Sequence, residues 1–261
     1  MNKDSENRNI RAHKKLNDIG FPHRIINLIV FEKVRYCLKK IPNINEIRPR
    51  FLDVGCGTGY LLKKMLGQGL DAWGLDPYPR GAAAQQSLSE RVIQGNIQNL
   101  PKKPFQIITA VEVLEHVEDY MKLLKSMMEL LSPDGFLIIT VPNKWEFRAT
   151  YSSDGDIAPM YGHVWQFDGD SLESDLRCFS KEVDIEQVYS RNLDRRLLKI
   201  IRVLPSVIVI NLNKILLNHY NDGAWLLGVT KKEKILSDET TYATLPKPSA
   251  NYFKNDPVFV K

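Results

Sequence analysis

The sequence has 261 residues with a formal net charge of +5, and 43% of the residues are hydrophobic and 26% charged. This composition is that of a globular protein with one large α/β domain or two small ones. The three cysteines are far apart and form no CxxC pair, which argues against a disulfide framework or a zinc site. We expect a cytoplasmic protein, because the first residues lack the apolar core of a signal peptide and no apolar run is long enough to span a membrane.

The positive charge is concentrated at the N-terminus. Residues 1–50 hold 12 Lys and Arg against 5 Asp and Glu, so the other 211 residues carry a net charge of −2. Such a basic arm can contact RNA or an anionic membrane, although most arms of this kind are simply solvated. Residues 8–42 mix charged and apolar residues at helical spacing, so we expect an N-terminal helical extension over residues 1–46 that packs on the main domain.

From Phe51 onward, short apolar segments alternate with helical ones. This alternation predicts an α/β fold, a Rossmann-like, seven-stranded and mostly parallel sheet with helices on both faces. The expected helices cover residues 59–69, about 81–90, 118–131 and 169–179. The expected strands cover residues 51–55, 71–76, 91–96, 105–113, 135–143, 181–190 and 223–232.

Three further segments complete the expected organisation around a main domain of residues 47–231. Residues 144–168 show no alternation, and loops of this length are often lids or substrate-binding segments. Residues 191–222 are expected to form a helical insertion before the last strand. The tail, residues 232–261, is rich in Ser, Thr, Pro and Asn, and we expect it to be loosely held.

A glycine turn follows the first expected strand. Gly55, Gly57 and Gly59 are more glycines than a plain turn needs. The dinucleotide fingerprint G-x-G-x-x-G requires a third glycine where this chain has Tyr60, and no Gly-Lys-Ser/Thr follows as in a phosphate-binding P-loop. Neither pyrophosphate nor triphosphate is therefore the natural ligand of this turn.

An acidic residue ends each of the first two strands. Asp76 stands where a carboxylate can accept hydrogen bonds from a ribose diol, and Asp53 lies beneath the glycine turn. Ribose without pyrophosphate suggests an adenosine that carries an amino-acid tail. The alternative interpretation of Asp76 is an aspartate that only caps a turn.

Four motifs, "LDVGCGTG", "GLDP", "VIQGNIQNLP" and "EVLEHVED", occur in this order. With them the chain resembles the class I S-adenosylmethionine-dependent methyltransferases, in particular the ubiquinone-biosynthesis-type O-methyltransferases, from Phe51 to Asn143 and more weakly to Lys231. The resemblance implies S-adenosylmethionine as cofactor, with Asn96 in place of the family's usual acidic residue. The implied cofactor-binding residues are Asp53, Gly55, Cys56, Gly57, Gly59, Asp76, Pro77, Asn96, Ile97, Val111 and Glu112.

The stretch "EVLEH" suggests an acceptor-side site. In a helix that begins there, Glu112, Glu115 and His116 share one face, and His163 in the long loop adds a fourth ligand for Mg²⁺ or Mn²⁺. The small-RNA 3′-end 2′-O-methyltransferases have a similar stretch and a later histidine that bind a divalent metal. Alternatively, the acidic residues only complement a helix dipole, and His116 or His163 acts as a general base or makes a plain backbone contact. We also expect Tyr161 and Trp165 to line the acceptor pocket.

The acceptor is open at this stage. Residues 191–220 hold six Lys or Arg and one acidic residue among many aliphatic ones, which suits a membrane surface or a greasy substrate, but packing on the sheet or in a homodimer is the commoner use. The preferred function is O-methylation of a small-molecule, glycan or lipid-linked hydroxyl. The alternatives are a non-catalytic S-adenosylmethionine-binding protein, an RNA 2′-O-methyltransferase, disfavoured because no nucleic-acid-binding module is recognisable, and an NAD-dependent oxidoreductase, disfavoured by Tyr60.

Overall fold

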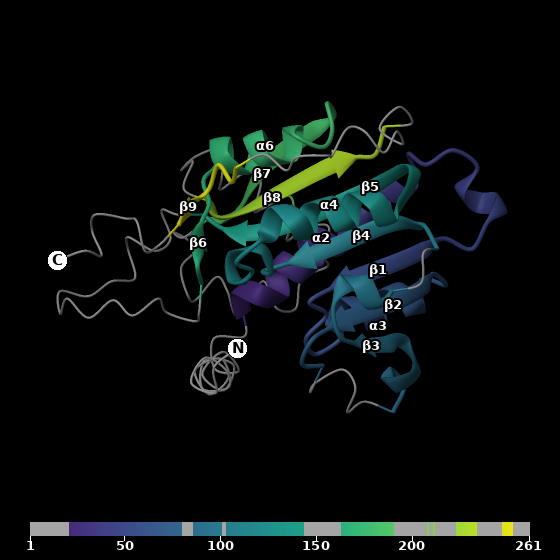
Figure 1. Ribbon diagram of the computed structural model, residues 1–261. Helices are drawn as coiled ribbons and strands as arrows, with labels where there is room; N and C mark the ends of the chain where they lie inside the picture. The colour runs from purple at the N-terminus through teal and green to yellow at the C-terminus, as the bar shows by residue number, and fades with distance from the viewer. Residues whose placement is uncertain are drawn as a thin grey trace.

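The computed structural model describes residues 21–79, 86–100, 103–143, 163–190, 208, 211, 223–233 and 247–252. Its centre is a seven-stranded sheet of order β3-β2-β1-β4-β5-β8-β7 (Figure 1). The strands from β3 to β5 run parallel, and β8 is antiparallel to both β5 and β7. The strands are β1 (Arg50–Val54), β2 (Asp71–Asp76), β3 (Val92–Gln94), β4 (Phe105–Val111), β5 (Leu131–Pro142), β7 (Val183–Ser190) and β8 (Gly223–Lys231).

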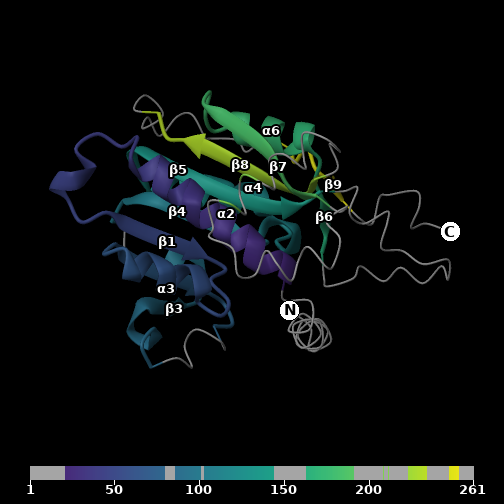
Figure 2. The same cartoon turned by 180° about the vertical axis from the view of Figure 1, so that it is seen from behind.

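The predicted seven-stranded sheet is confirmed. Its central strands are apolar on both faces, so helices must cover both faces. Ile107 and Ile138 point into one apolar cluster, whereas Ile108 and Ile139 point into another. Helices α2 (Phe21–Leu38) and α3 (Tyr60–Gly67) bury their apolar sides in the first cluster and cover that face (Figure 2). Helices α4 (Tyr120–Leu130) and α6 (Gly169–Arg177) cover the opposite face, seen in Figure 1.

Side-chain caps fix the start of the last two helices. Asp119 accepts a hydrogen bond from the Lys122 amide at the start of α4. At the start of α6, Asp168 and Ser171 form a reciprocal capping box, with the Ser171 amide 2.8 Å from Asp168 Oδ1. Each cap satisfies an amide that the first helical turn leaves without a partner.

A second, two-stranded sheet was not expected from the sequence. Strand β6 (Trp165–Gln166) pairs antiparallel with β9 (Asn251–Tyr252), so part of the expected loose tail is tied to the end of the expected lid loop. Short 3₁₀ helices complete the described elements: η1 (Ile44–Glu46), η2 (Ser89–Arg91), η3 (Ile97–Asn99) and η4 (Leu114–His116).

Several expectations fall on parts of the chain that the structure does not describe. Residues 1–20, 144–162 and, apart from positions 208 and 211, the insertion 191–222 lie outside the described residues. The helical insertion and the domain boundaries therefore stay predictions, whereas α2 shows that the N-terminal extension packs on the sheet. Among the described helices, none is both long enough and apolar enough to cross a membrane.

Candidate functional site

The glycine turn connects β1 to α3 at the carboxyl edge of the sheet. Gly55, Gly57 and Gly59 have φ angles of 71°, 49° and 74°, a left-handed region that favours glycine. The amides of Gly55 and Cys56 donate to the Leu75 carbonyl oxygen at 2.7 and 3.2 Å, which ties the turn to the end of β2. The turn is thus held in place by backbone contacts and needs glycine for its shape.

The glycines differ in the space that is available for a side chain. A Cβ on Gly55 would stand 2.5 Å from Val113 Cγ2, so Gly55 allows close packing of the protein on itself. A Cβ on Gly57 would meet only the Gly55 carbonyl oxygen at 3.9 Å among the described atoms. Gly57 therefore faces open space in which a ligand can approach the backbone.

The Asp76 side chain caps two turns, the glycine turn after β1 and the turn that follows Asp76 itself. Its Oδ2 accepts from the Gly57 amide at 2.9 Å, and its Oδ1 accepts from the Tyr78 amide at 2.7 Å. These two contacts show that Asp76 caps turns, as the alternative interpretation expected. A carboxylate has about four lone-pair sites, so two are left for a ligand diol.

Asp53 is buried beneath the turn, with 4% of its surface exposed. Thr109 Oγ1 donates to Asp53 Oδ1 at 2.8 Å. Burial raises the pKa of Asp53 to about 7, against the lowering effect of the Thr109 hydrogen bond, and the negative charge of Asp76 adds to the rise. A buried carboxyl with no cationic side chain beside it among the described residues is a suitable partner for an ammonium group.

Cys56 has a packing role. Its Sγ would be 2.7 Å from a Cβ on Gly74 in β2, so the thiol occupies the space that this glycine leaves. Burial, followed by the charges of Asp53 and Asp76, raises the pKa of the thiol, which keeps it protonated and unreactive.

The residues expected around the adenine come from the ends of β2 and β3. Pro77 and Asn96 are exposed, and Ile97 is buried in the apolar cluster under α4. Gln94 Nε2 donates to the Pro77 carbonyl oxygen at 3.4 Å, so the two strand ends are in contact. Val111 ends β4 and packs against the cluster under α2. Since these strands are parallel neighbours, all of the expected cofactor residues lie at one edge of the sheet.

The α-helix expected to begin at Glu112 is not present in this described part of the chain. The φ of 57° at Glu112 places it in the left-handed region, and only the short η4 follows, so Glu112, Glu115 and His116 do not share the face of an α-helix. The Glu112 carboxylate accepts from Trp225 Nε1 at 2.6 Å and from Thr140 Oγ1 at 3.1 Å. Burial raises its pKa to about 7, opposed by these two hydrogen bonds. Such a backbone conformation is costly for a residue other than glycine and is typical of functional sites.

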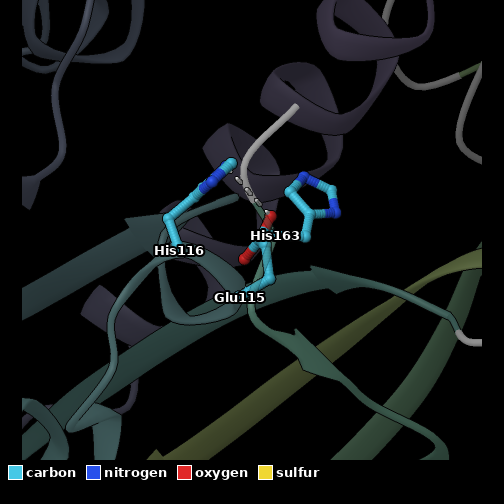
Figure 3. A group of neighbouring side chains, drawn as sticks. All are labelled: Glu115, His116 and His163. Atoms are coloured by element: carbon cyan, nitrogen blue, oxygen red, sulfur yellow. Dashed lines mark ion pairs between the residues drawn. The ribbon is translucent and has the colours of Figure 1, made fainter. Parts of the chain in front are cut away.

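The other three expected ligands do come together (Figure 3). Glu115, His116 and His163 each offer one ligand atom, and these atoms all lie within 4.8 Å of one another, whereas Glu112 is not part of this group. His116 Nε2 is 3.9 Å from Glu115 Oε1, and the two imidazole rings are 4.5 Å apart between centroids. The Val164 amide donates to the Glu115 carbonyl oxygen at 2.7 Å, which fixes the segment of His163 against η4.

The environment of this cluster suits a divalent cation. Glu115 is 1% exposed, and neither of its carboxylate oxygens makes a hydrogen bond within the described part of the chain. Burial and the nearby Glu112 raise the pKa of Glu115 well above its ordinary value. Burial and His116 lower the pKa of His163 to about 2, so this imidazole is a weak base but, being neutral, a competent ligand. One buried carboxylate and two imidazoles fit Mg²⁺, Mn²⁺ or Zn²⁺.

Comparison with known proteins agrees with this arrangement. The family model described as "Methyltransferase domain" matches residues 16–179, well over half of the chain. The chain belongs to the methyltransferase domain family. The chain is therefore a class I S-adenosylmethionine-dependent methyltransferase domain with the Rossmann-like sheet of that fold, as the motifs predicted.

Several curated relatives of this methyltransferase domain are named as ubiquinone biosynthesis O-methyltransferases. The protein of that name from Azorhizobium caulinodans is 32% identical over 103 residues, covering 36% of this chain and 41% of the relative. The mitochondrial enzyme of Homo sapiens is 29% identical over 150 residues, covering 49% of this chain and 41% of the relative. The chain thus matches about half or less of the length of these relatives.

Solved structures support the fold alone. The plantazolicin methyltransferase BamL, determined with a triazolic desmethylPZN analog and SAH, has a TM-score of 0.60 at 15% identity, covering 88% of this chain and 97% of the other. A possible histamine N-methyltransferase from Thermotoga maritima has a TM-score of 0.58 at 19% identity, covering 85% of this chain and 97% of the other.

Several residues of the methyltransferase site were missed from the sequence. Thr109, Thr140 and Trp225 donate to the two acidic side chains, Asp53 and Glu112. A threonine inside an apolar strand is the only signal for the first two, and nothing local predicts Trp225, which comes from β8. Trp165 was expected in the acceptor pocket, but its indole N–H donates to the Val117 and Glu118 carbonyl oxygens, at 2.9 and 3.2 Å. Tyr161 lies outside the described residues.

Proposed function

We propose that the protein is an S-adenosylmethionine-dependent O-methyltransferase that acts on a hydroxyl group of a small-molecule, glycan or lipid-linked acceptor. The observation that carries this proposal is the placement of two sites at one edge of the sheet. One is the open glycine turn, and the other is the buried cluster of Glu115, His116 and His163. Val113 links them, because it packs on Gly55 and lies two residues before Glu115.

The chemistry explains why both sites are needed. The sulfonium donor is already activated, so the protein mainly positions the acceptor in line with the methyl group. A hydroxyl acceptor must also lose its proton, which requires a base or a metal ion near the acceptor oxygen. In this proposal the glycine turn holds the methyl donor, and the cluster orients the acceptor hydroxyl and promotes loss of its proton.

The cofactor's binding groups are assigned as follows. The Asp53 carboxylate takes the ammonium group of the methionine part, and the free lone pairs of Asp76 take the ribose hydroxyls. The open backbone at Gly57 allows the methionine part to approach closely. Asn96 replaces the acidic residue usual at its position, and its side-chain carbonyl can accept from the adenine amino group.

On the acceptor side, Glu115, His116 and His163 are proposed to hold a divalent cation, Mg²⁺ or Mn²⁺, with Glu112 outside the ligand set. A bound cation lowers the pKa of an acceptor hydroxyl and orients it. The buried carboxyl of Glu115 supports this assignment, since neither oxygen makes a hydrogen bond within the described part of the chain and a buried polar group without one is costly unless something binds it.

The choice of oxygen as the acceptor atom rests on the curated relatives, which are named as O-methyltransferases. A screen of phenols, sugars and lipid-linked hydroxyl compounds with a labelled methyl donor tests it. We expect transfer to at least one hydroxyl compound and its loss on addition of a chelator. Transfer to amines or thiols only would contradict the proposed acceptor, and transfer unaffected by the chelator would contradict the metal.

A further inference from the structure

A buried hydrogen-bond network fastens the segment 247–252 to the helices of the outer face. Asp175, which is completely buried in α6, accepts from the Ser249 amide at 2.8 Å through Oδ1 and from the Tyr120 hydroxyl at 2.5 Å through Oδ2. The Ala250 amide donates in turn to the Tyr120 hydroxyl oxygen at 3.3 Å. Neither Tyr120 nor Asp175 has a part in the cofactor or acceptor chemistry assigned above.

The fastened segment continues directly into β9. Asn251 and Tyr252 pair with Gln166 and Trp165 of β6, the strand that follows His163 (Figure 1). Strand β9 thus lies along the outer side of β6 and covers backbone groups that an edge strand would otherwise leave open.

The segment that leads into β6 contacts the candidate metal cluster. The Val164 amide donates to the Glu115 carbonyl oxygen, and the Trp165 indole donates to the Val117 carbonyl oxygen just beyond η4. The Trp165 ring also meets the Tyr120 ring edge-on, 5.1 Å between centroids. His163 therefore lies in the segment just before β6, which is fixed to η4 through Val164 and continues into the strand that pairs with β9.

We propose that Tyr120 and Asp175 are positioning residues, which latch the segment 247–252 onto β6 and thereby hold His163 against Glu115 and His116. The effect of this latch on metal affinity rests on the proposed metal-binding function of that cluster, whereas its effect on the position of His163 does not. A fully satisfied buried network is suited to this task, because it specifies one arrangement of the elements it joins. Groups that orient metal ligands typically contribute 10- to 100-fold in metal affinity.

The first experiment compares three changes in the full protein by calorimetric titration with Mn²⁺ and, separately, with S-adenosylhomocysteine. The changes are Tyr120→Phe, which removes both hydrogen bonds and keeps the ring, Asp175→Asn, and a chain that ends at residue 246. The matched control is a chain that ends at Tyr252 and keeps the latch. We expect Mn²⁺ affinity to fall about 10- to 100-fold in the three variants and to stay unchanged in the control. S-Adenosylhomocysteine affinity, which reports on the intact fold, should be unchanged in all four.

Mn²⁺ affinity equal to that of the unmodified chain in all three variants would overturn the latch. So would an equal loss of Mn²⁺ and S-adenosylhomocysteine affinity, because it would mean a general loss of structure.

A second measurement separates the latch from the metal. In ¹⁵N-histidine-labelled protein without added metal, the ring resonances of His163 are expected to shift in the three variants and not in the control. If the unmodified chain binds no Mn²⁺ but His163 shifts as expected, the metal assignment fails and the latch stands. If His163 resonances are the same in all four chains, the latch is wrong whatever the metal does.

Discussion

The Gly57 amide donates to Asp76 Oδ2 at 2.9 Å and thereby joins the glycine turn of β1 to the end of β2. The Asp76 carboxylate thus fixes the shape of the glycine turn and keeps further lone pairs for a ligand bound beside the turn. The contact explains why a ribose-binding aspartate and a structural cap need not be alternatives. In the proposed binding mode, the same side chain caps the turn and accepts from the ribose.

A side chain at Gly57 should abolish cofactor binding. In Gly57→Val the new side chain occupies the open space before the turn, and φ of 49° is unfavourable for a β-branched residue. Calorimetry should show no S-adenosylhomocysteine binding to this variant and, in the unmodified chain, binding of S-adenosylhomocysteine but not of NAD. Gly67→Ala is the matched control, because a Cβ there meets nothing within 4 Å. Tight NAD binding without a response to either methionine nucleoside would contradict the assignment.

Replacing Asp76 tests its double role. Asp76→Ala removes the acceptor of the Gly57 and Tyr78 amides as well as the proposed ribose contact. Hydrogen bonds to a charged group contribute about 1.5–3 kcal/mol each, so we expect S-adenosylhomocysteine affinity to fall at least about tenfold. Methylthioadenosine, which keeps the ribose but lacks the amino-acid tail, should lose affinity by a similar factor. Loss for S-adenosylhomocysteine alone would show that Asp76 acts only through the turn.

Most of the fold was predictable, because its signals are local. The apolar strand that contains Asp53, the strand that ends at Asp76, and the glycines between strand and helix follow directly from residue type and spacing. The β6–β9 pair was not predictable, since its strands have two residues each and depend on contacts between positions far apart in the chain. Pairs of this kind carry almost no periodic signal.

The site was predictable only in part. Residue type and order were enough to bring Glu115, His116 and His163 together. The expected role of Glu112 as a metal ligand was wrong, because the prediction assumed helical spacing. The backbone at Glu112 is instead left-handed, and its carboxylate accepts a hydrogen bond from Trp225, far along the chain in β8. Long-range partners of this kind cannot be read from a local motif.

Cofactor affinity should depend on pH through Asp53. Its pKa of about 7 in the free protein means that below pH 7 the carboxyl must lose a proton before it can pair with the cofactor's ammonium group. Affinity for S-adenosylhomocysteine is therefore expected to fall by up to about tenfold per pH unit below 7 and to level off above it. Asp53→Asn should bind more weakly at pH 8 and show a flatter profile. A profile that is unchanged in Asp53→Asn would assign the dependence to another group.

The basic, apolar residues 191–220 suit an anionic membrane surface, although packing on the sheet or on a second copy of the chain is the commoner use of such a segment. If residues 191–220 bind at a membrane surface, the protein should sediment with phosphatidylserine-containing vesicles at low salt. It should be released at high salt, because salt screens the attraction between the basic side chains and the anionic lipids. Neutral phosphatidylcholine vesicles are the control. No sedimentation with anionic vesicles at low salt would leave packing on the sheet or on a second copy of the chain as the explanation.

Glu115 provides the sharpest test of the acceptor site. Glu115→Gln keeps the shape of the side chain and removes the buried carboxyl, which has no hydrogen bond in the described part of the chain. Mn²⁺ affinity and turnover should fall by more than about tenfold, the effect expected even of an outer-shell partner, while S-adenosylhomocysteine affinity stays unchanged. The free energy of unfolding should change little, because burial already favours the neutral form of Glu115 and glutamine has nearly the same shape. Glu118→Gln, at an exposed position three residues further on, is the matched control and should change none of these quantities. If Glu115→Gln lowers stability and cofactor affinity together but leaves Mn²⁺ binding intact, Glu115 is a structural residue and the proposed cation site is wrong.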